Sequence, residues 1–174
     1  MKRFFHSLNR KELFDHLAER KASSGLNLPI IVDPHPNNFV SYHGITLAKP
    51  NRAEAEWASG IVINDKASSV RAAQILRERW MSEMMMITLG KDGLVIVNDD
   101  HPDGIYLETV ARKVYDVSGA GDAVTAVFAA VFAKTKDVQL AGELSNVAGG
   151  IVVSEVGTAP IDIQKLRSYL LEEK

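Results

Sequence analysis

The sequence contains no cysteine, no excess of basic residues and no long apolar run, and each absence excludes a class of protein or site. Without cysteine there is neither a disulfide framework nor a thiolate metal site, so a reducing compartment is permitted and the cytoplasm is the expected location. The 20 lysines and arginines are scattered among 22 aspartates and glutamates, which gives a net charge of -2. Such a chain lacks the basic field that dominates nucleic-acid affinity, so we expect no nucleic-acid partner.

Membrane insertion and export are not expected either. The positively charged start, "MKRFFHSLNRKELF", is not followed by a long apolar run or a small-residue cleavage site. Internal repeats, low-complexity tracts and interdomain linkers are absent from the sequence. With 46% hydrophobic and 24% charged residues, residues 1–174 are expected to form a single globular domain.

Apolar patterning predicts helices and strands that alternate along the chain. The run "MMMITLG" is typical of a strand covered on both faces in a parallel sheet, and "LVIVN" and "IYLETV" flank the turn-forming "DDHPDG" as a hairpin. The expected helices cover residues 9–25 (capped by Asn9), 51–59, 67–80, 120–134, 138–153 and 162–172, and two further strands are "LPIIVD" and "GITLAK". This order predicts a layered α/β sandwich.

Helical spacing also identifies the residues expected in the core. The helix at 67–80 carries an apolar face, and the helices at 120–134 and 138–153 are expected to be largely buried. We expect core packing for Trp57 and for the strand entered through "MSEMMM". The predicted faces consist of Val70, Ala73, Leu76 and Trp80 in one helix and of Leu140, Leu144, Val147 and Ile151 in another.

The stretch "DVSGAGDAV" places small residues and then a carboxylate at the start of an alanine-rich helix. The first amides of a helix lack partners within it, and glycines at 119 and 121, with Ala120 between them, let a phosphate oxygen approach those amides closely. Asp122 would then lie beside the phosphate, where it can accept the proton of an attacking hydroxyl. The alternative is an ordinary acidic residue in the first turn of a helix.

Two further stretches allow a functional and a structural interpretation. In "KPNRAE", Asn51 and Glu54 have a spacing that suits a hydrated magnesium ion, and the same spacing suits a capping box. "TLGKDG", residues 88–93, suits close approach of a nucleotide or a simple hairpin turn. Since all three stretches follow predicted strands, we expect them to converge at the edge where open α/β sheets bind ligands.

Taken together, "KPNRAE", "TLGKDG", "DVSGAGDAV" and "SNVAGGIVVSEVGT" resemble the ribokinase-like (phosphofructokinase-B-type) sugar kinases in order and spacing. Within that family, "YHGITLAKPNRAEAE" and "VYDVSGAGDAV" are most similar to the kinase domain of the heptose-7-phosphate kinases, or bifunctional ADP-heptose synthases, which supply precursors of lipopolysaccharide. The resemblance begins near residue 9 and implies a three-layer α/β/α sandwich. It also implies transfer of the γ-phosphoryl group of ATP to a sugar hydroxyl.

The resemblance implies a role for each matching residue. Asp122 would be the catalytic base, and the amides of Gly119, Ala120 and Gly121 would form the anion hole. Asn51 and Glu54 would organise Mg²⁺ and the nucleotide phosphates, and the nucleotide would contact Thr88, Gly90, Gly93 and Asn146. An activating K⁺ would lie near Asp116 and Ser118, with backbone groups of Val152, Glu155 and Gly157.

The sequence also departs from the family. "DPHP" stands where "DPK" is common in heptose kinases, which removes a basic group from that loop. The N-terminal portion that supplies most sugar contacts and a small β lid has no counterpart here, so the fold is expected to be truncated at its N-terminus. We therefore expect a complementary N-terminal chain or a homo-oligomer beside the small-molecule sugar phosphate. The alternative function is a nucleotide-binding or assembly module without independent kinase activity.

Overall fold

The computed structural model describes residues 10–23, 25, 28–35, 42, 44–111, 114–155, 157 and 161–172, so the expected cap Asn9 lies outside the described residues. The helices are α1 (Arg10–Ser23), α2 (Arg52–Ser59), α3 (Lys66–Arg79), α4 (Ala120–Thr135), α5 (Val138–Val153) and α6 (Ile163–Glu172). The strands are β1 (Ile31–Val32), β2 (Leu47–Ala48), β3 (Met84–Thr88), β4 (Leu94–Val97) and β5 (Ile105–Leu107), and a short 3₁₀ helix, η2 (Gly90–Asp92), joins β3 to β4. None of these helices is both long and apolar enough to cross a bilayer.

The five strands form one mixed sheet in the order β1-β2-β3-β4-β5. β1, β2 and β3 are parallel, whereas β4 runs antiparallel to both β3 and β5. The predicted hairpin is therefore confirmed. The strands predicted from "LPIIVD" and "GITLAK" are correct in place but shorter than predicted, at two residues each.

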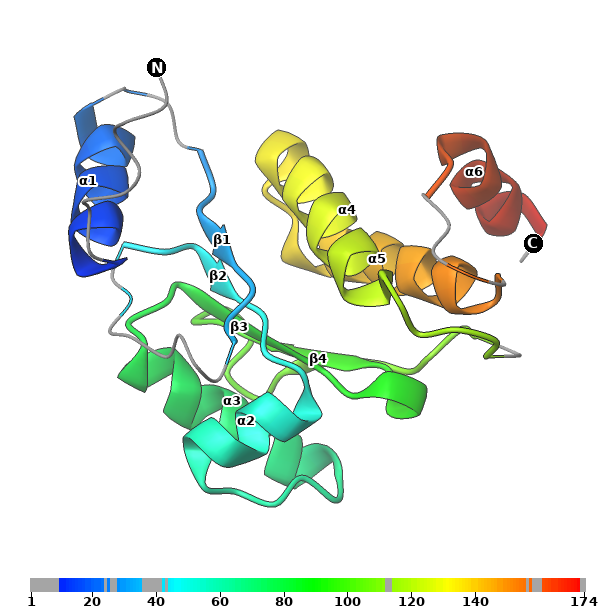
Figure 1. Cartoon of the computed structure of the whole chain (residues 1–174), viewed down its shortest axis with the longest axis horizontal. Helices are drawn as coiled ribbons and strands as arrows, with labels where there is room; N and C mark the ends of the chain where they lie inside the picture. Colours follow the sequence, from blue (N-terminus) through cyan, green and yellow to red (C-terminus); the bar gives the residue numbers. More distant parts are fainter. Residues whose placement is uncertain are drawn as a thin grey trace.

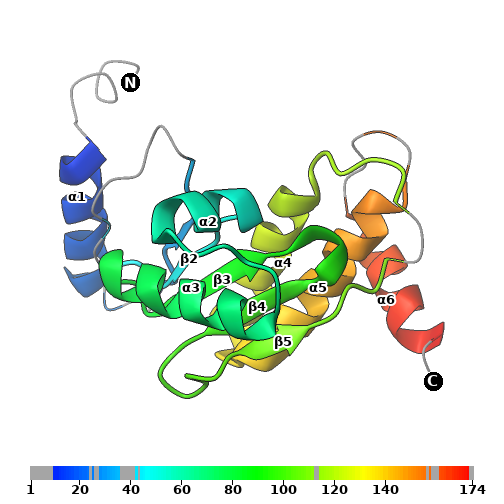
Figure 2. The same ribbon diagram turned by 90° about the horizontal axis from the view of Figure 1, so that it is seen from below.

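Helices cover both faces of the sheet, which confirms the predicted α/β/α sandwich (Figures 1 and 2). α2 and α3 lie on one face, and α4 and α5 lie on the other. The side chains of β3 alternate between these layers: Met85 and Ile87 join the core with α2 and α3, and Met84 and Met86 join the core with α4. This alternation is why an uninterrupted apolar run forms the central strand.

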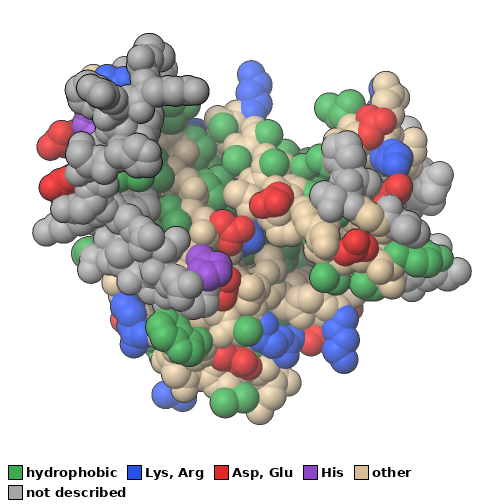
Figure 3. Space-filling view, in the orientation of Figure 1, with side chains coloured by type: hydrophobic (Ala, Val, Ile, Leu, Met, Phe, Trp, Pro, Cys, Tyr) green, Lys and Arg blue, Asp and Glu red, His purple; other side chains and the backbone are tan. Residues whose placement is uncertain are grey.

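The two long helices after the sheet differ in burial. Eight of the 16 residues of α5 are buried, which agrees with the prediction. In α4 only Ala123, Val124 and Phe128 are buried, so the prediction of a largely buried helix is wrong for α4. The physical reason is that α4 packs mainly against α5 and the sheet, which leaves apolar side chains visible over its outer side (Figure 3).

Candidate active site

The turn before α4 leaves backbone donors available at the start of that helix. Gly119 caps α4 in the left-handed conformation (φ 80°, ψ -6°), and no side chain caps it. The Ala120 N–H donates to the carbonyl of Val117 at 3.3 Å, whereas the amides of Gly121 and Asp122 have no acceptor among the described residues. Two unpaired amides at the positive end of a helix dipole form a place where an anion is stabilised.

The proposed base lies at this turn. Asp122 belongs to the first turn of α4, and its side chain is exposed. Its carboxylate forms no hydrogen bond or ion pair with the part of the chain that the structure describes. The position is open to a substrate hydroxyl, and it is equally the position of an ordinary acidic residue near a helix start.

Lys49 brings a cation to the same turn. Leu47 packs in the core that contains Phe128 of α4, and because alternate residues of an extended segment share a face, Lys49 faces the same layer. A Cβ placed on Gly121 would lie 3.4 Å from the Lys49 Nζ. The lysine side chain is only 3% exposed, and its ammonium donates to an Oδ2 of Asp33 at 2.9 Å. A buried ammonium therefore lies directly against the glycine turn of α4.

Asn51 and Glu54 form the capping box that their spacing allows. The Asn51 N–H donates to Glu54 Oε2 at 2.8 Å, and the Glu54 N–H donates to Asn51 Oδ1 at 3.0 Å. The structural interpretation is thus correct, and it leaves the role in magnesium binding untested. Asn51 also pairs with Thr88 in a parallel bridge, and the Thr88 N–H donates to the Pro50 carbonyl at 3.1 Å. These contacts place "KPNRAE" beside the start of "TLGKDG".

The potential metal ligands near Asn51 suit Mg²⁺ only if the ion keeps most of its coordinated water molecules. Glu54 retains a second carboxylate oxygen, Oε1, and Asn51 supplies amide groups at the start of α2. No group of three acidic or histidine side chains that could hold a metal occurs in the described ranges. Magnesium commonly binds through one or two carboxylates together with water and substrate phosphates, so this sparse set fits that ion.

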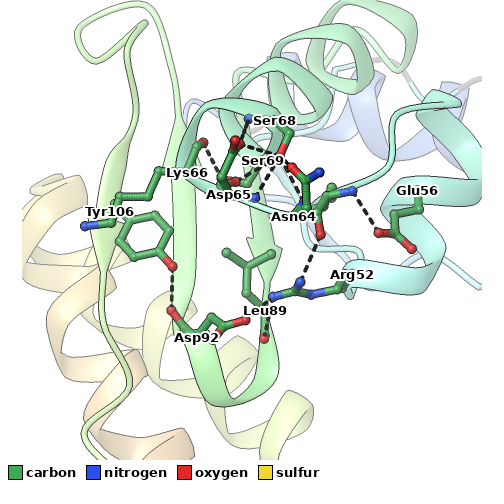
Figure 4. A network of polar contacts seen from close by, with 11 residues as sticks. Arg52, Glu56, Asn64, Asp65, Lys66, Ser68, Ser69, Leu89, Asp92 and Tyr106 are labelled. Atoms are coloured by element: carbon green, nitrogen blue, oxygen red, sulfur yellow. Dashed lines mark hydrogen bonds and ion pairs between the residues drawn. The ribbon is translucent and has the colours of Figure 1, made fainter.

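Arg52 fixes the distance between α2 and the turn after β3. Its guanidinium donates to the carbonyls of Ile63, at 2.9 Å, and of Leu89, at 3.2 Å, and it also pairs with the carboxylate of Asp92. Figure 4 shows Arg52 reaching from α2 to Leu89 and Asp92, with the Tyr106 hydroxyl donating to the Asp92 carbonyl from the other side at 2.8 Å. This network holds two of the sequence-predicted stretches in one rigid unit.

The two glycines of "TLGKDG" have different environments. Gly90 has φ 63°, is exposed, and has open space where a Cβ would be. Gly93 has φ 92° and is buried, and a Cβ there would lie 1.9 Å from the Leu107 carbonyl oxygen of β5. Gly93 is therefore required by the close approach of β5, whereas Gly90 leaves its side of the turn accessible to a ligand.

The remaining predicted site residues lie in two places, in the linker that joins β5 to α4 and in the helix α5. Asn146 of α5 donates through Nδ2 to the Glu108 carbonyl at 2.7 Å, which ties α5 to the end of β5. No hydrogen bond joins Asn146 to the glycine turn among the described residues, and its predicted role in the nucleotide pocket stays a prediction.

The segment predicted to hold K⁺ is ordered by its own hydrogen bonds. Asp116 Oδ1 accepts from the Ser118 N–H at 2.8 Å, and the Tyr115 N–H donates to the Val153 carbonyl at 2.7 Å. The Ser118 N–H, together with the Ser118 hydroxyl, holds the pKa of Asp116 below its usual value. Asp116 therefore remains ionised over a wide pH range, as a cation ligand must, and potassium binding here stays a prediction.

Sequence reasoning missed Lys49, Asp33 and Arg52. Lys49 and Arg52 both stand within "KPNRAE", and Asp33 directly follows the first predicted strand. Lysine is almost never fully buried unless it is paired, but only the pairing of β1 with β2 shows that Asp33 is close enough to pair with Lys49.

Comparisons with known proteins give matches to carbohydrate kinases. The profile of the pfkB family of carbohydrate kinases matches residues 2–165. The chain is 40% identical to the Bifunctional protein HldE of Desulfatibacillum aliphaticivorans over 164 residues, which cover 94% of this chain and 33% of that protein. It is 42% identical to the Bifunctional protein HldE of Pelobacter propionicus over 134 residues, covering 77% of this chain and 27% of that protein. The chain thus spans about a third of the length of these relatives.

Solved structures show the same fold. Phosphofructokinase-2 from Escherichia coli in complex with potassium superposes with a TM-score of 0.77 and 20% identity, over 94% of this chain and 53% of that chain. Arabidopsis thaliana ribokinase complexed with ribose and ATP superposes with a TM-score of 0.72 and 21% identity, over 91% of this chain and 52% of that chain. The match to the ribokinase-like fold therefore covers about half of each of these proteins.

Proposed function

The chain belongs to the pfkB family of carbohydrate kinases, and we propose on this basis that it forms the nucleotide-binding and catalytic half of an ATP-dependent sugar kinase. One observation carries the proposal: a single segment contacts both of the other stretches. Lys49 lies against the turn at Gly121, and two residues later Asn51 pairs with Thr88. Phosphoryl transfer is catalysed mainly by positioning and by stabilising charge, so this convergence is what a kinase site needs.

In the proposed reaction, Asp122 accepts the proton of the attacking sugar hydroxyl. The hydroxyl oxygen forms a bond to the γ-phosphorus, and the bond from that phosphorus to the β,γ-bridging oxygen breaks, so that ADP leaves with the bonding electrons. The unpaired amides of Gly121 and Asp122 stabilise the charge on the transferred group. Mg²⁺ held near Asn51 and Glu54 would neutralise phosphate charge when it is bound.

We infer that the acceptor is a heptose 7-phosphate and that the reaction serves the synthesis of ADP-heptose precursors of lipopolysaccharide. The support is the similarity of "YHGITLAKPNRAEAE" and "VYDVSGAGDAV" to the heptose-7-phosphate kinases. Identities of 40% and 42% to two proteins named HldE agree with this choice within the family.

Release of ADP tests the proposal directly. The purified chain is assayed with ATP, Mg²⁺ and heptose 7-phosphate, and in parallel with fructose 6-phosphate, with ribose and with no sugar. ADP release stimulated by heptose 7-phosphate above the other acceptors is expected from the proposed enzyme. Equal release in all four reactions would contradict a sugar kinase of this specificity.

The second candidate is a nucleotide-binding or assembly module that needs a complementary chain for turnover. The apolar helix α4, with only three of its 16 residues buried, favours this possibility, and so does β1, which forms one edge of the sheet. A sheet edge without a partner strand among the described residues and an apolar helix that is only partly covered both favour association with another polypeptide.

Mixing experiments separate the two candidates. The chain is assayed alone and after addition of the N-terminal half of the kinase domain from an HldE relative. Turnover that appears only on mixing identifies a module, and turnover by the chain alone identifies an independent enzyme. Sedimentation of the isolated chain in the same buffer determines whether a homo-oligomer accounts for its activity.

A further inference from the structure

The backbone pairing between the stretches "KPNRAE" and "TLGKDG" ends at Asn51 and Thr88. The Thr88 N–H donates to the Pro50 carbonyl at 3.1 Å, and Asn51 pairs with Thr88 in a parallel bridge. The structure describes both stretches in full, and no ladder pair joins them beyond this point. The turn that follows is η2, which has only three residues and no side-chain cap at Leu89. Because a short 3₁₀ helix has poor internal hydrogen bonds, η2 depends on contacts from outside to hold its position.

The side chain of Arg52 continues the connection where the backbone pairing stops. Its guanidinium donates to the Leu89 carbonyl at 3.2 Å and pairs with the carboxylate of Asp92, so it contacts both ends of η2. From β5, the Tyr106 hydroxyl donates to the Asp92 carbonyl at 2.8 Å (Figure 4). The planar guanidinium can bind two acceptors at once through its fork of N–H donors, which the compact ammonium of a lysine does not match. The turn is therefore held between α2 and β5.

Arg52 stands between two places that can accept a ligand. Within η2, Gly90 is exposed and has open space where a Cβ would be, so these contacts leave one side of the turn accessible. Directly before Arg52, Asn51 forms the capping box with Glu54, whose Oε1 remains available to a hydrated Mg²⁺. One side chain thus connects the turn suited to a nucleotide with the helix start suited to a metal.

Stability alone does not account for this arrangement. The side chains of Arg52 and Asp92 are 34% and 42% exposed, and ion pairs in contact with water contribute little to stability. Arg77 makes a comparable bridge at the other end of β3, where it donates to the Glu83 carbonyl at 2.9 Å and pairs with Asp99 at 2.6 Å. None of these three residues belongs to a predicted site stretch. Arg77 is therefore a bridge of the same kind without a candidate site beside it.

We propose that Arg52 is a positioning residue that couples nucleotide binding at η2 to Mg²⁺ binding at Asn51 and Glu54, a role that rests on the kinase function proposed above. A complex of Mg²⁺ and a nucleotide would attach through its nucleoside at η2 and through its metal at the capping box. Two attachments strengthen each other only when the distance between them matches the span of the ligand. Arg52 holds that distance constant, because it begins α2 and contacts both ends of η2. Each ligand then raises the affinity for the other by the same factor.

The test measures how much Mg²⁺ improves the binding of ADP. Dissociation constants for ADP are determined by calorimetry on the full chain, once with Mg²⁺ and once with EDTA. For Arg52→Met, the constant in Mg²⁺ should rise about tenfold, a size typical of coupling between two sites, and the constant in EDTA should stay within about threefold. The matched control is Arg77→Met, which removes the comparable bridge and should leave the improvement by Mg²⁺ unchanged.

Asp92→Asn provides the second variant, and circular dichroism verifies that each variant is folded. It removes the ion pair but retains the contacts of Arg52 with the carbonyls of Ile63 and Leu89, so the improvement by Mg²⁺ should shrink by less. This variant gives the same comparison where Arg52→Met does not fold.

The coupling is overturned if Arg52→Met weakens ADP by the same factor with Mg²⁺ and with EDTA, which is the result of a purely local disturbance of η2. It is also overturned if the variants at Arg52 and Asp92 retain the improvement by Mg²⁺ that Arg77→Met shows. A wild-type chain that binds no ADP under either condition would instead overturn the proposed kinase function itself.

Discussion

Replacing Gly121 with alanine is expected to impair nucleotide binding without destabilising the fold. Among the described residues, and apart from its chain neighbours and the backbone of α4 itself, the one atom within 4 Å of the new Cβ is the Lys49 Nζ, at 3.4 Å, which is an ordinary van der Waals contact. Gly121 lies inside α4 without a positive φ, and alanine is favoured over glycine in a helix by about 0.5–1 kcal/mol. The free energy of unfolding should therefore stay level or rise by up to about 1 kcal/mol, which corresponds to about 2–4 °C in Tm for a chain of this size.

The same methyl group covers the place where a phosphate would meet the amides of Gly121 and Asp122. Loss of one such hydrogen bond to a charged oxygen should weaken the β,γ-imido analogue of ATP about tenfold or more in calorimetry. Gly150→Ala is the matched control, because its Cβ would lie 2.5 Å from the Val110 Cγ2. That variant should lose about 1–3 kcal/mol of stability through overpacking. The reasoning is refuted if Gly121→Ala melts as low as Gly150→Ala or binds the analogue like the wild-type chain.

Three further predictions concern the base, the core and the linker before α4. In an active assembly, Asp122→Asn should lower kcat by about 100-fold to 10,000-fold while the affinity for the ATP analogue is retained, and unchanged kcat would exclude the residue as base. Phe128→Ala removes a fully buried ring and should cost about 3–5 kcal/mol in urea unfolding; a loss below about 1 kcal/mol would show that the core cluster is misassigned. The Ser118 N–H holds the pKa of Asp116 below its usual 3.8, so its stabilising contribution is present above that value and is lost as the pH falls through the lowered pKa. Melting of Asp116→Asn and wild type should thus differ at neutral pH and converge in acid, and a difference that grows in acid would have the wrong sign.

The architecture could be predicted because its signals are local. The run "MMMITLG" is apolar without interruption, and Met84, Met85 and Met86 are indeed all buried. The predicted face of α3 is also correct, since Ala73 and Leu76 are fully buried. In each case the spacing of the apolar residues indicates how many faces of the strand or helix are buried. This spacing can be recognised within a few consecutive residues.

Predictions that depended on what lies across from a helix were less successful. Trp57 was expected to pack in the core, yet it is 68% exposed. In α5 the predicted stripe is only partly correct, because Val147 is buried but Leu140 is exposed, while the small residues Ala141 and Ala148 are fully buried. Small residues let a helix approach its neighbour closely, so the buried face follows the neighbouring backbone rather than the largest apolar side chains.

The motifs of the candidate site could be predicted from the sequence, whereas the buried cation of Lys49 beside them could not. The spacing of Asn51 and Glu54 predicts their capping box because both partners belong to one turn of helix. The contact of Lys49 with the turn at Gly121 joins residues that are far apart in the sequence. It depends on the pairing of β2 within the sheet and on where α4 crosses it, and neither is encoded within a single stretch.

The position of the candidate site follows from the change in burial and charge along the extended segment at residues 47–51. Residues 47, 49 and 51 alternate with residues that face α2 and α3, so the first two share the side of α4. Leu47 is fully buried in the apolar core, Lys49 is buried but charged, and Asn51 is exposed at the start of α2. The apolar core thus ends at Lys49, and the first group beyond it is a cation held against a helix start. A charge at this boundary is shielded from water, because the Lys49 side chain is only 3% exposed, and in such surroundings electrostatic interactions are stronger than at the surface.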